Sequence, residues 1–281
     1  MNKFFLDLLV QIVGIGSASG LFYKDNSIYV ISDNSAYLYE YKMDDKALNK
    51  TLLFEENENL VFENIPKNLK PDFEALCSYG DDLYLFGSGS TANRTNLIHY
   101  NRKSNAVVSS TDLSDLYAVL QSFSSIDPKD FNIEGAVFTG ETWYLFQRGN
   151  GGTGKNGVFT IEGASLETNY SVLYKNFKLP KIKGVEATFT DAIKVDNKLY
   201  FLATVEDTKS TYDDGAILGS FIGAIDIDKM KIDFTQKITS EHKFEGLTLY
   251  KNEKGKKEFL LCEDNDTDAQ NSSIYKLTLQ K

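Results

Sequence analysis

Hydrophobic and polar positions follow one another along the chain in short blocks: an apolar run, a polar turn and a second apolar run. Five segments share this pattern, and each opens with Ser, Glu or Thr. They read SGLFYKDNSIYVISD from Ser19, EALCSYGDDLYLFGS from Glu74, EGAVFTGETWYLFQR from Glu134, TDAIKVDNKLYFLAT from Thr190 and EGLTLYKNEKGKKEFLLCE from Glu245. Two short apolar runs around a turn such as Asp25-Asn26 are typical of a β-hairpin.

The five hairpins start at nearly regular intervals of 55, 60, 56 and 55 residues. The 36 residues after Glu245 and the first 19 residues together make one more interval of 55. A second hairpin follows in each interval, which gives the four strands of a propeller blade. We therefore predict that residues 1–281 form one all-β domain, a five-bladed β-propeller whose last blade is closed by an N-terminal strand near Phe4–Ile12. A β-sandwich is the alternative, but sandwiches lack a constant period of this size.

The interruptions of the pattern fit the same architecture. One helix-like insertion, around Asp112–Phe123, ends the second repeat. Prolines cannot donate a ladder hydrogen bond and belong outside central strands. All four lie between the predicted blades, at Pro66, Pro71, Pro128 and Pro180.

The N-terminal stretch MNKFFLDLLVQIVGIGSASG has two interpretations. Lys3, an apolar run and small residues near Ala18 are typical of a short signal peptide, but Asp7 and Gln11 interrupt the run. We predict an outer β-strand here and a cytoplasmic protein, with an exported protein as the alternative. No other stretch approaches the roughly 20 apolar residues of a membrane helix, so we expect no membrane partner.

Composition narrows the choice of partners. The net charge is −10, and no basic stripe is present to neutralise phosphates, so we expect no nucleic-acid partner. The acidic balance suits either cation binding or plain solubility. The two cysteines, Cys77 and Cys262, lie far apart in strand-like runs and predict no disulfide framework. We expect a monomer.

The first residues of the five hairpins predict a metal site. The innermost strand of each blade lines the propeller axis, so residues in the same register converge there. Carboxylates gathered in a confined space raise one another's pKa or require a cation. The donors are all oxygens, which favours calcium, with magnesium second and zinc disfavoured. A water-filled channel is the alternative. These predicted metal ligands, called the ring positions below, are Ser19, Glu74, Glu134, Thr190 and Glu245.

A second set of candidates lies about fourteen residues after each ring position, where the hairpin returns to the same face. Polar and glycine-rich loops follow there, and arginines can clamp an anionic ligand with two hydrogen bonds. The predicted anion-binding residues are Arg94, Arg148, Asn150 and Tyr212. The predicted catalytic residues, which would position or activate a water or hold the substrate, are Asp33, Arg148, Glu206 and Glu263. The alternative for the arginines is a counter-ion role beside Glu134 or Glu263.

The mixed Ser and Glu ring positions resemble the central calcium site of calcium-activated nucleotidases (apyrases), which are five-bladed propellers. The runs SGLFYKDNSIYVISDNSAYLYEY and IEGAVFTGETWYLFQRGN are similar to those of esterase-like phytases. KPDFEA, LFGSGST, QRGN and STYDDGAILGSFIG resemble an uncharacterised bacterial propeller family. The resemblance implies the fold and a calcium site, whereas the nucleotidase substrate residues have no counterparts that can be matched one by one.

Two functions remain open from the sequence. One is a calcium-dependent hydrolase of a small anionic substrate such as a phosphate ester, in which the metal acts as Lewis acid or anchor. The other is a non-catalytic module that binds a ligand or a protein and holds calcium structurally.

Overall fold

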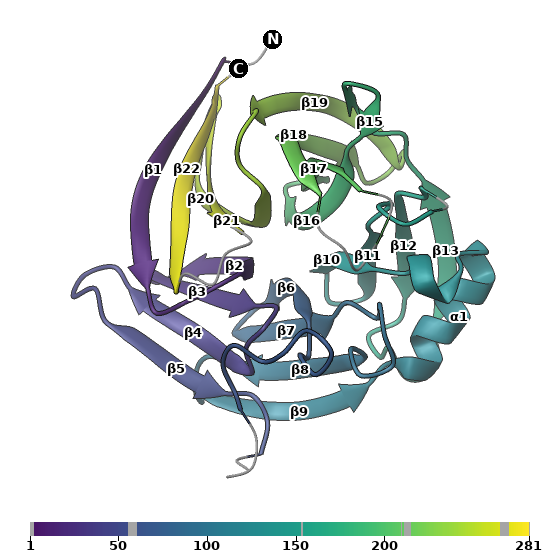
Figure 1. Cartoon of the computed structure of the whole chain (residues 1–281), viewed down its shortest axis with the longest axis horizontal. Coiled ribbons are helices and arrows are strands. Elements are labelled where there is room, and N and C mark those ends of the chain that lie inside the picture. Colours follow the sequence, from purple (N-terminus) through teal and green to yellow (C-terminus); the bar gives the residue numbers. More distant parts are fainter. Residues whose placement is uncertain are drawn as a thin grey trace.

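The computed structural model describes residues 3–55, 61–152, 154–208, 210, 215–264 and 270–280. Five four-stranded antiparallel sheets surround a central axis, so the predicted five-bladed β-propeller is confirmed (Figure 1). The first four blades are β2 (Ala18–Lys24), β3 (Ser27–Ser32), β4 (Tyr37–Lys42) and β5 (Leu48–Leu52); β6 (Phe73–Tyr79), β7 (Asp82–Gly87), β8 (Asn96–Asn101) and β9 (Ala106–Asp112); β10 (Ile133–Phe138), β11 (Thr142–Gln147), β12 (Gly157–Glu162) and β13 (Ser171–Asn176); and β16 (Thr188–Val195), β17 (Lys198–Asp207), β18 (Ala216–Asp226) and β19 (Lys231–Thr239).

The fifth blade joins the two ends of the chain. Strands β20 (Phe244–Glu253), β21 (Lys256–Glu263) and β22 (Asn271–Gln280) are followed outward by β1 (Lys3–Val13). β1 pairs antiparallel with β22, with Phe4 opposite Leu279 and Ile12 opposite Ser272. The predicted closure by the N-terminal strand is therefore confirmed, and it ties residues far apart in sequence into one ladder (Figure 1).

Four short elements connect the blades. α1 (Ser114–Ser124) confirms the predicted helical insertion and lies beside β13 (Figure 1). A single 3₁₀ turn, η1 (Pro128–Asp130), leads from it to the third blade. A two-stranded ribbon, β14 (Lys181–Ile182) and β15 (Val185–Glu186), precedes the fourth. In the described ranges, no helix is long and apolar enough to cross a bilayer.

The blades pack face to face, so most inner strands are buried on both faces. β3, for example, is buried along its whole length, which explains why its sequence is a continuous apolar run rather than an alternating one. Between the third and fourth blades, the ring of Phe189 packs edge-on against Phe146 and Phe201 at 5.1 and 5.0 Å. Edge-to-face aromatic pairs of this kind add stability beyond the burial of their area. Such contacts fix the blades around the axis and hence the geometry of the channel.

Candidate functional site

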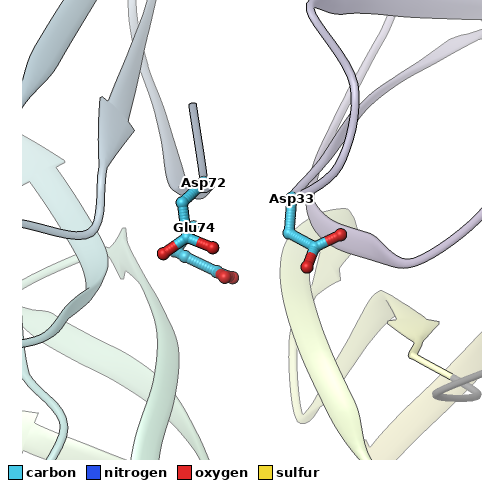
Figure 2. A group of neighbouring side chains, drawn as sticks. All are labelled: Asp33, Asp72 and Glu74. Atoms are coloured by element: carbon cyan, nitrogen blue, oxygen red, sulfur yellow. The ribbon is translucent and has the colours of Figure 1, made fainter. Parts of the chain in front are cut away.

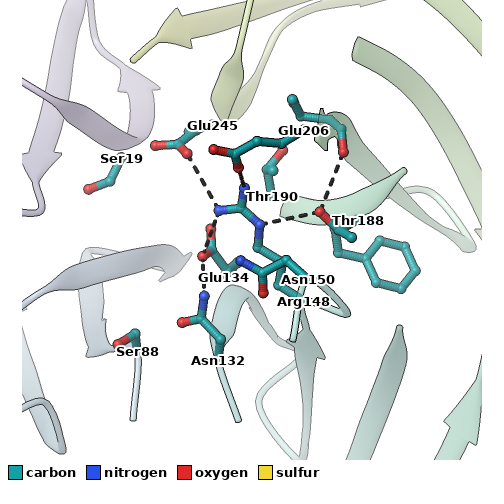
Figure 3. A network of polar contacts seen from close by, with 12 residues as sticks. Ser19, Ser88, Asn132, Glu134, Arg148, Asn150, Thr188, Thr190, Glu206 and Glu245 are labelled. Carbon is teal, nitrogen blue, oxygen red and sulfur yellow. Dashed lines mark hydrogen bonds and ion pairs between the residues drawn. The ribbon is translucent and has the colours of Figure 1, made fainter. Parts of the chain in front are cut away.

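Each of the five ring positions is the extra residue of a β-bulge. In every innermost strand the pairing with the second strand shifts across the ring position, as between Phe73 and Ala75 or Ile133 and Gly135. The same shift occurs around Ser19, Thr190 and Glu245. A bulge leaves one residue unpaired and redirects its side chain. The neighbours of the bulge face adjacent blades, whereas Glu134, Glu245 and Ser19 lie around the centre (Figure 3).

The two hydroxyl-bearing ring positions link adjacent blades. Ser19 Oγ donates to the carbonyl oxygen of Phe73 in the second blade. Thr190 Oγ1 donates to the carbonyl oxygen of Phe244 in the fifth, at 2.7 Å. Both acceptors immediately precede a ring glutamate in the chain. The hydroxyls therefore fix the position of the backbone just before Glu74 and Glu245. Each hydroxyl oxygen can still accept a hydrogen bond through its lone pairs.

Arg148 is the hub of one side of the channel (Figure 3). Its guanidinium donates to Glu134 Oε1 at 3.0 Å, to Glu206 Oε2, and through Nε to Thr188 Oγ1 at 3.2 Å. Glu245 Oε1 lies 3.8 Å from the same group. Arg148 is only 5% exposed, and burial works against its charge, but the nearby glutamates raise its pKa. These contacts favour the counter-ion alternative for this arginine.

Lys243 supplies a second cation beside Glu245. Its Nζ lies 3.1 Å from Glu245 Oε1 and 2.9 Å from Asp264 Oδ2. Burial nevertheless raises the pKa of Glu245 well above its ordinary value, with the charges of Asp264 and Glu134 adding to the shift. Lys243 and Arg148 only partly offset this effect.

The other side of the channel is formed by Asp33, which follows β3, and by Asp72 and Glu74 at the start of β6. One carboxylate oxygen of each lies within 4.8 Å of the other two, and the three side chains face one another (Figure 2). Lys70 Nζ contacts Asp33 Oδ2 and lies 2.7 Å from Asp72 Oδ1. The predicted catalytic Asp33 and the predicted metal ligand Glu74 thus belong to one cluster, called the Asp–Glu cluster below.

Arg94 belongs to the same side but points at a carboxylate. Its Nη1 lies 2.8 Å from Asp72 Oδ2, and its Nη2 donates to the carbonyl oxygen of Lys67. Arg94 is 3% exposed and shares no carboxylate partner with Arg148 in the described contacts. As with Arg148, the contacts favour the counter-ion alternative, and the anion-binding role remains a prediction.

Carboxylates outnumber cations around the axis. Among the residues that the structure describes, seven carboxylates are in contact with or next to four cations. The carboxylates are Asp33, Asp72, Glu74, Glu134, Glu206, Glu245 and Asp264, and the cations are Lys70, Arg94, Arg148 and Lys243. Seven less four leaves an excess of three negative charges when all are ionised. Burial accordingly raises the pKa of several of these acids, among them Glu74 and Glu245.

Glu74 is the ring glutamate that no described cation contacts. It receives no hydrogen bond from the described residues, and it is half-buried because it borders the channel. Its surroundings raise its pKa well above the ordinary value, first by burial and then through the charges of Glu134, Asp72 and Glu245. In contrast, Lys70 and Arg94 hold the pKa of Asp72 below its ordinary value against the effect of burial.

Two further oxygens in this region are buried and make no hydrogen bond in the described structure, namely Glu134 Oε2 and Asp33 Oδ1. A buried acceptor without a donor is costly and calls for water or an ion. Glu134 itself is only 2% exposed, and its charge acts more strongly on Glu74 than that of any other residue. Asp33 Oδ1 thus belongs to the Asp–Glu cluster, whereas Glu134 Oε2 belongs to the carboxylate that contacts Arg148.

The remaining predicted residues have separate environments. Glu263 accepts from His242 Nδ1 at 2.6 Å and from the hydroxyl of Tyr275 at 3.1 Å. Burial and Glu263 raise the pKa of Tyr275 to about 12, so its hydroxyl stays protonated and donates a hydrogen bond to Glu263. Asn150 donates to the carbonyl oxygen of Ser210. Tyr212 lies outside the described residues.

The glycine-rich loop after Arg148 encloses a side chain of the protein itself. The backbone N–H of Gly152 donates to Asp130 Oδ1 at 2.9 Å, and a Cβ on Gly151 would come within 2.4 Å of the same oxygen. Glycine at 151 therefore permits close approach of the loop to a buried carboxylate. The N–H group that a phosphate would need is already used.

The sequence contains a signal that the ring prediction did not use. Asp72 and Lys243, whose charges act on two ring glutamates, lie two residues before Glu74 and Glu245. The third and fourth blades also have a polar residue two positions before the ring, in Asn132 and Thr188. The runs DFE, NIE, TFT and KFE thus repeat a polar, apolar, ring pattern, which would have identified these residues.

Comparisons with known proteins agree with the fold. The model of a family of unknown function (DUF6929) matches residues 14–279. The Mala s 1 allergen of Malassezia sympodialis is similar in structure, with a TM-score of 0.60, 12% identity and 96% of each chain covered. Myxococcus xanthus glutaminyl cyclase has a TM-score of 0.54 and 11% identity, with 98% of this chain and 97% of that one covered. No curated protein gives a significant match.

At such low identities the two structures support the fold alone. The family match agrees with the expected uncharacterised propeller family, although a bacterial origin is not part of that match. The similarity to nucleotidases and phytases remains a prediction.

Proposed function

Since the chain belongs to the DUF6929 family, whose function is unknown, we propose a function from its own channel: binding of a divalent cation, calcium first and magnesium second, at the Asp–Glu cluster. The observation that carries this proposal is the excess of carboxylates whose oxygens have no donor. Glu74 has no hydrogen bond among the described residues, and Glu134 Oε2 and Asp33 Oδ1 are buried without one.

The donor set favours a hard cation. Asp33, Asp72 and Glu74 offer only oxygens, and the described residues bring neither histidine nor cysteine into this cluster. Calcium accepts six to eight oxygens at 2.3–2.6 Å in flexible geometry, and waters complete its shell. Magnesium needs a stricter octahedron, which three side chains on separate loops and strands supply less readily.

The structural role of this cation suits a binding module better than an anion-activating enzyme. Arg94 and Arg148, the predicted anion clamp, each contact carboxylates and are nearly fully buried. A small anionic ligand would therefore be held through the cation itself. We favour a non-catalytic module in which the cation links the first and second blades beside the axis.

One observation favours hydrolysis as a second candidate. The carboxylate of Glu263 orients His242 through Nδ1, and no described residue contacts its Nε2, so the imidazole is arranged as a proton acceptor. A screen of phosphate esters and lactones with and without calcium tests this candidate. Turnover that requires calcium and is lost in His242→Gln would support hydrolysis, and no turnover of any substrate would leave the binding module.

Calorimetric titration of the chelator-treated protein with calcium and with magnesium tests the cation site. We expect one binding event, tighter for calcium, and a higher melting temperature at saturation, because a ligand that binds only the folded form stabilises it. An unchanged melting curve and no binding heat would contradict the proposal and favour the hydrated channel.

A further inference from the structure

We infer that Lys70 is an internal competitor for the cation of the Asp–Glu cluster: its ammonium group holds the position between Asp33 and Asp72, and calcium binds by displacing it. The inference rests on the proposed function. It adds that the protein carries its own exchangeable cation, which sets the affinity of the site.

The geometry makes the two cations mutually exclusive. Lys70 Nζ contacts Asp33 Oδ2 and lies 2.7 Å from Asp72 Oδ1, while one oxygen of each cluster carboxylate lies within 4.8 Å of the others. A calcium ion at 2.3–2.6 Å from the same oxygens would occupy the space of the ammonium. Lys70 is 8% exposed, so its charge is held inside the protein rather than at the surface.

The lysine satisfies this site only in part. One positive charge faces three carboxylates, and Arg94 already contacts the other oxygen of Asp72. Glu74 stays without a hydrogen bond from the described residues, and Glu134 Oε2 stays buried without a donor. Asp33 Oδ1, an oxygen of the cluster itself, is also buried without a hydrogen bond although Lys70 contacts Oδ2, and this oxygen points to a ligand beyond Lys70.

The surroundings allow the exchange without moving the ligands. Asp72 Oδ2 accepts from Ser88 Oγ and from Arg94 Nη1, so Asp72 keeps its position when Lys70 leaves. The backbone at Lys70 is fixed, because its N–H donates to the carbonyl oxygen of Pro66 and Pro71 follows. The flexible four-carbon stem of the lysine provides the movement. Replacement of one charge by two would then relieve part of the excess at the axis.

The experiment compares Lys70→Met with the wild type in calcium titrations and thermal melts, each with chelator and with saturating calcium. We expect Lys70→Met to bind calcium more tightly, on the order of tenfold or more, because no ammonium has to be displaced. With chelator it should melt below the wild type, since two carboxylates lose their partner. With calcium it should gain more than the wild type does.

Two further variants separate displacement from general charge effects. Lys70→Arg keeps a charge in the site and should bind calcium no more tightly than the wild type. Lys67→Met removes the same charge from an exposed residue of the same loop and should leave the affinity within about twofold of the wild type, because solvent and salt screen exposed charges.

The outcomes distinguish the two proposals. If no variant and no wild type binds calcium, the proposed function fails and the inference fails with it. If the wild type binds calcium but Lys70→Met binds equally or less tightly, only the inference is overturned. An equal loss of melting temperature with chelator and with calcium would likewise make Lys70 a structural counter-ion. Should Lys70→Met not fold, Lys70→Gln replaces it with the same expected result.

Discussion

The two sides of the channel differ in whether a cation of the protein contacts the ring glutamate. In the third blade, the residue fourteen positions after the ring glutamate is Arg148, which returns along the hairpin to contact Glu134, Glu206 and Glu245. In the second blade, the residue fourteen positions after Glu74 is Ser88, which donates to Asp72 instead. One register position thus decides whether a ring glutamate has an internal guanidinium.

The difference shows that equivalent positions of a repeat need not be equivalent sites. On the Arg148 side, a forked cation bridges several carboxylates, and its loss would expose all of them to one another. On the Glu74 side, Lys70 and Arg94 engage Asp33 and Asp72, and the ring glutamate itself is left over. The first side is a structural network, and the second is suited to an exchangeable ion.

Removal of the guanidinium should have the largest effect. Arg148→Ala leaves Glu134, Glu206 and Glu245 buried without their common partner, so we expect the free energy of unfolding to fall by about 3–5 kcal/mol. Arg148→Lys keeps the charge but not the fork and should lose less. Urea denaturation measures both. A loss below about 1 kcal/mol for the alanine variant would show that the two sides do not differ in this way.

Removal of the Glu74 carboxylate should mainly reduce the stabilisation of the fold by calcium. At a hundredfold excess over Kd, the ion should stabilise the wild type by about 2.7 kcal/mol, and Glu74→Gln should abolish most of this gain. With chelator, the same variant should be no less stable than the wild type, because it removes an unbalanced charge. Glu258→Gln, at a glutamate of the fifth blade that pairs with Lys256, is the matched control and should keep the calcium response.

The pH dependence of stability should reflect one ring glutamate on each side of the channel. Burial raises the pKa of Glu74 and Glu245 well above the ordinary 4.5, so with chelator the folded protein holds protons that the unfolded chain has already lost. The free energy of unfolding should therefore fall as pH rises above about 4.5, by up to about 1.4 kcal/mol per pH unit for each such proton.

Calcium favours the ionised form and should flatten this slope, and Glu74→Gln should flatten it in chelator too. Urea denaturation from about pH 5 to about pH 8 gives the slopes. A stability that rises with pH in chelator would mean that the carboxylates are already balanced by the cations of the protein.

The smallest effect concerns the hydroxyl ring positions. Ser19→Ala removes the hydrogen bond to the carbonyl oxygen of Phe73 and should cost about 0.5–1.5 kcal/mol of stability. If Ser19 only links blades, calorimetry should give an unchanged calcium affinity. A clear weakening would instead make Ser19 a ligand, as the ring prediction has it, and would move the site toward the axis.

The sequence predicts the fold well because the fold repeats. Each interval contains its own turns and apolar runs, so the five hairpins, the closure by Phe4–Ile12 and the helix near Asp112–Phe123 follow from local patterns. The same register predicts which side chains surround the axis. The local sequence does not indicate which cation pairs with each carboxylate, because such pairs join distant residues. Arg148 and Glu206, for example, lie 58 positions apart.

Residues just outside the predicted hairpins were missed for a similar reason. Lys70 and Asp72 belong to the connection between two blades, where no strand pattern marks them. Their importance comes from the neighbouring blade, through the contact of Lys70 with Asp33. For Asp72, the repeated polar position two places before the ring could have served as a signal, whereas Lys70 lies four places before Glu74 and has no such signal.

The five bulges separate two kinds of evolutionary change. A side chain in a bulge faces the axis, whereas its strand neighbours pack between blades, so a substitution at Ser19 or Glu74 can alter the channel with few consequences for the packing. Each blade thus has one bulge residue that faces the axis, while the strands around it share the same architecture in all five blades. Exchange of Glu74, which makes no hydrogen bond with the described residues, could change the ion preference of the site, whereas exchange of Glu134 or Glu245 would also break their ion pairs with Arg148 and Lys243.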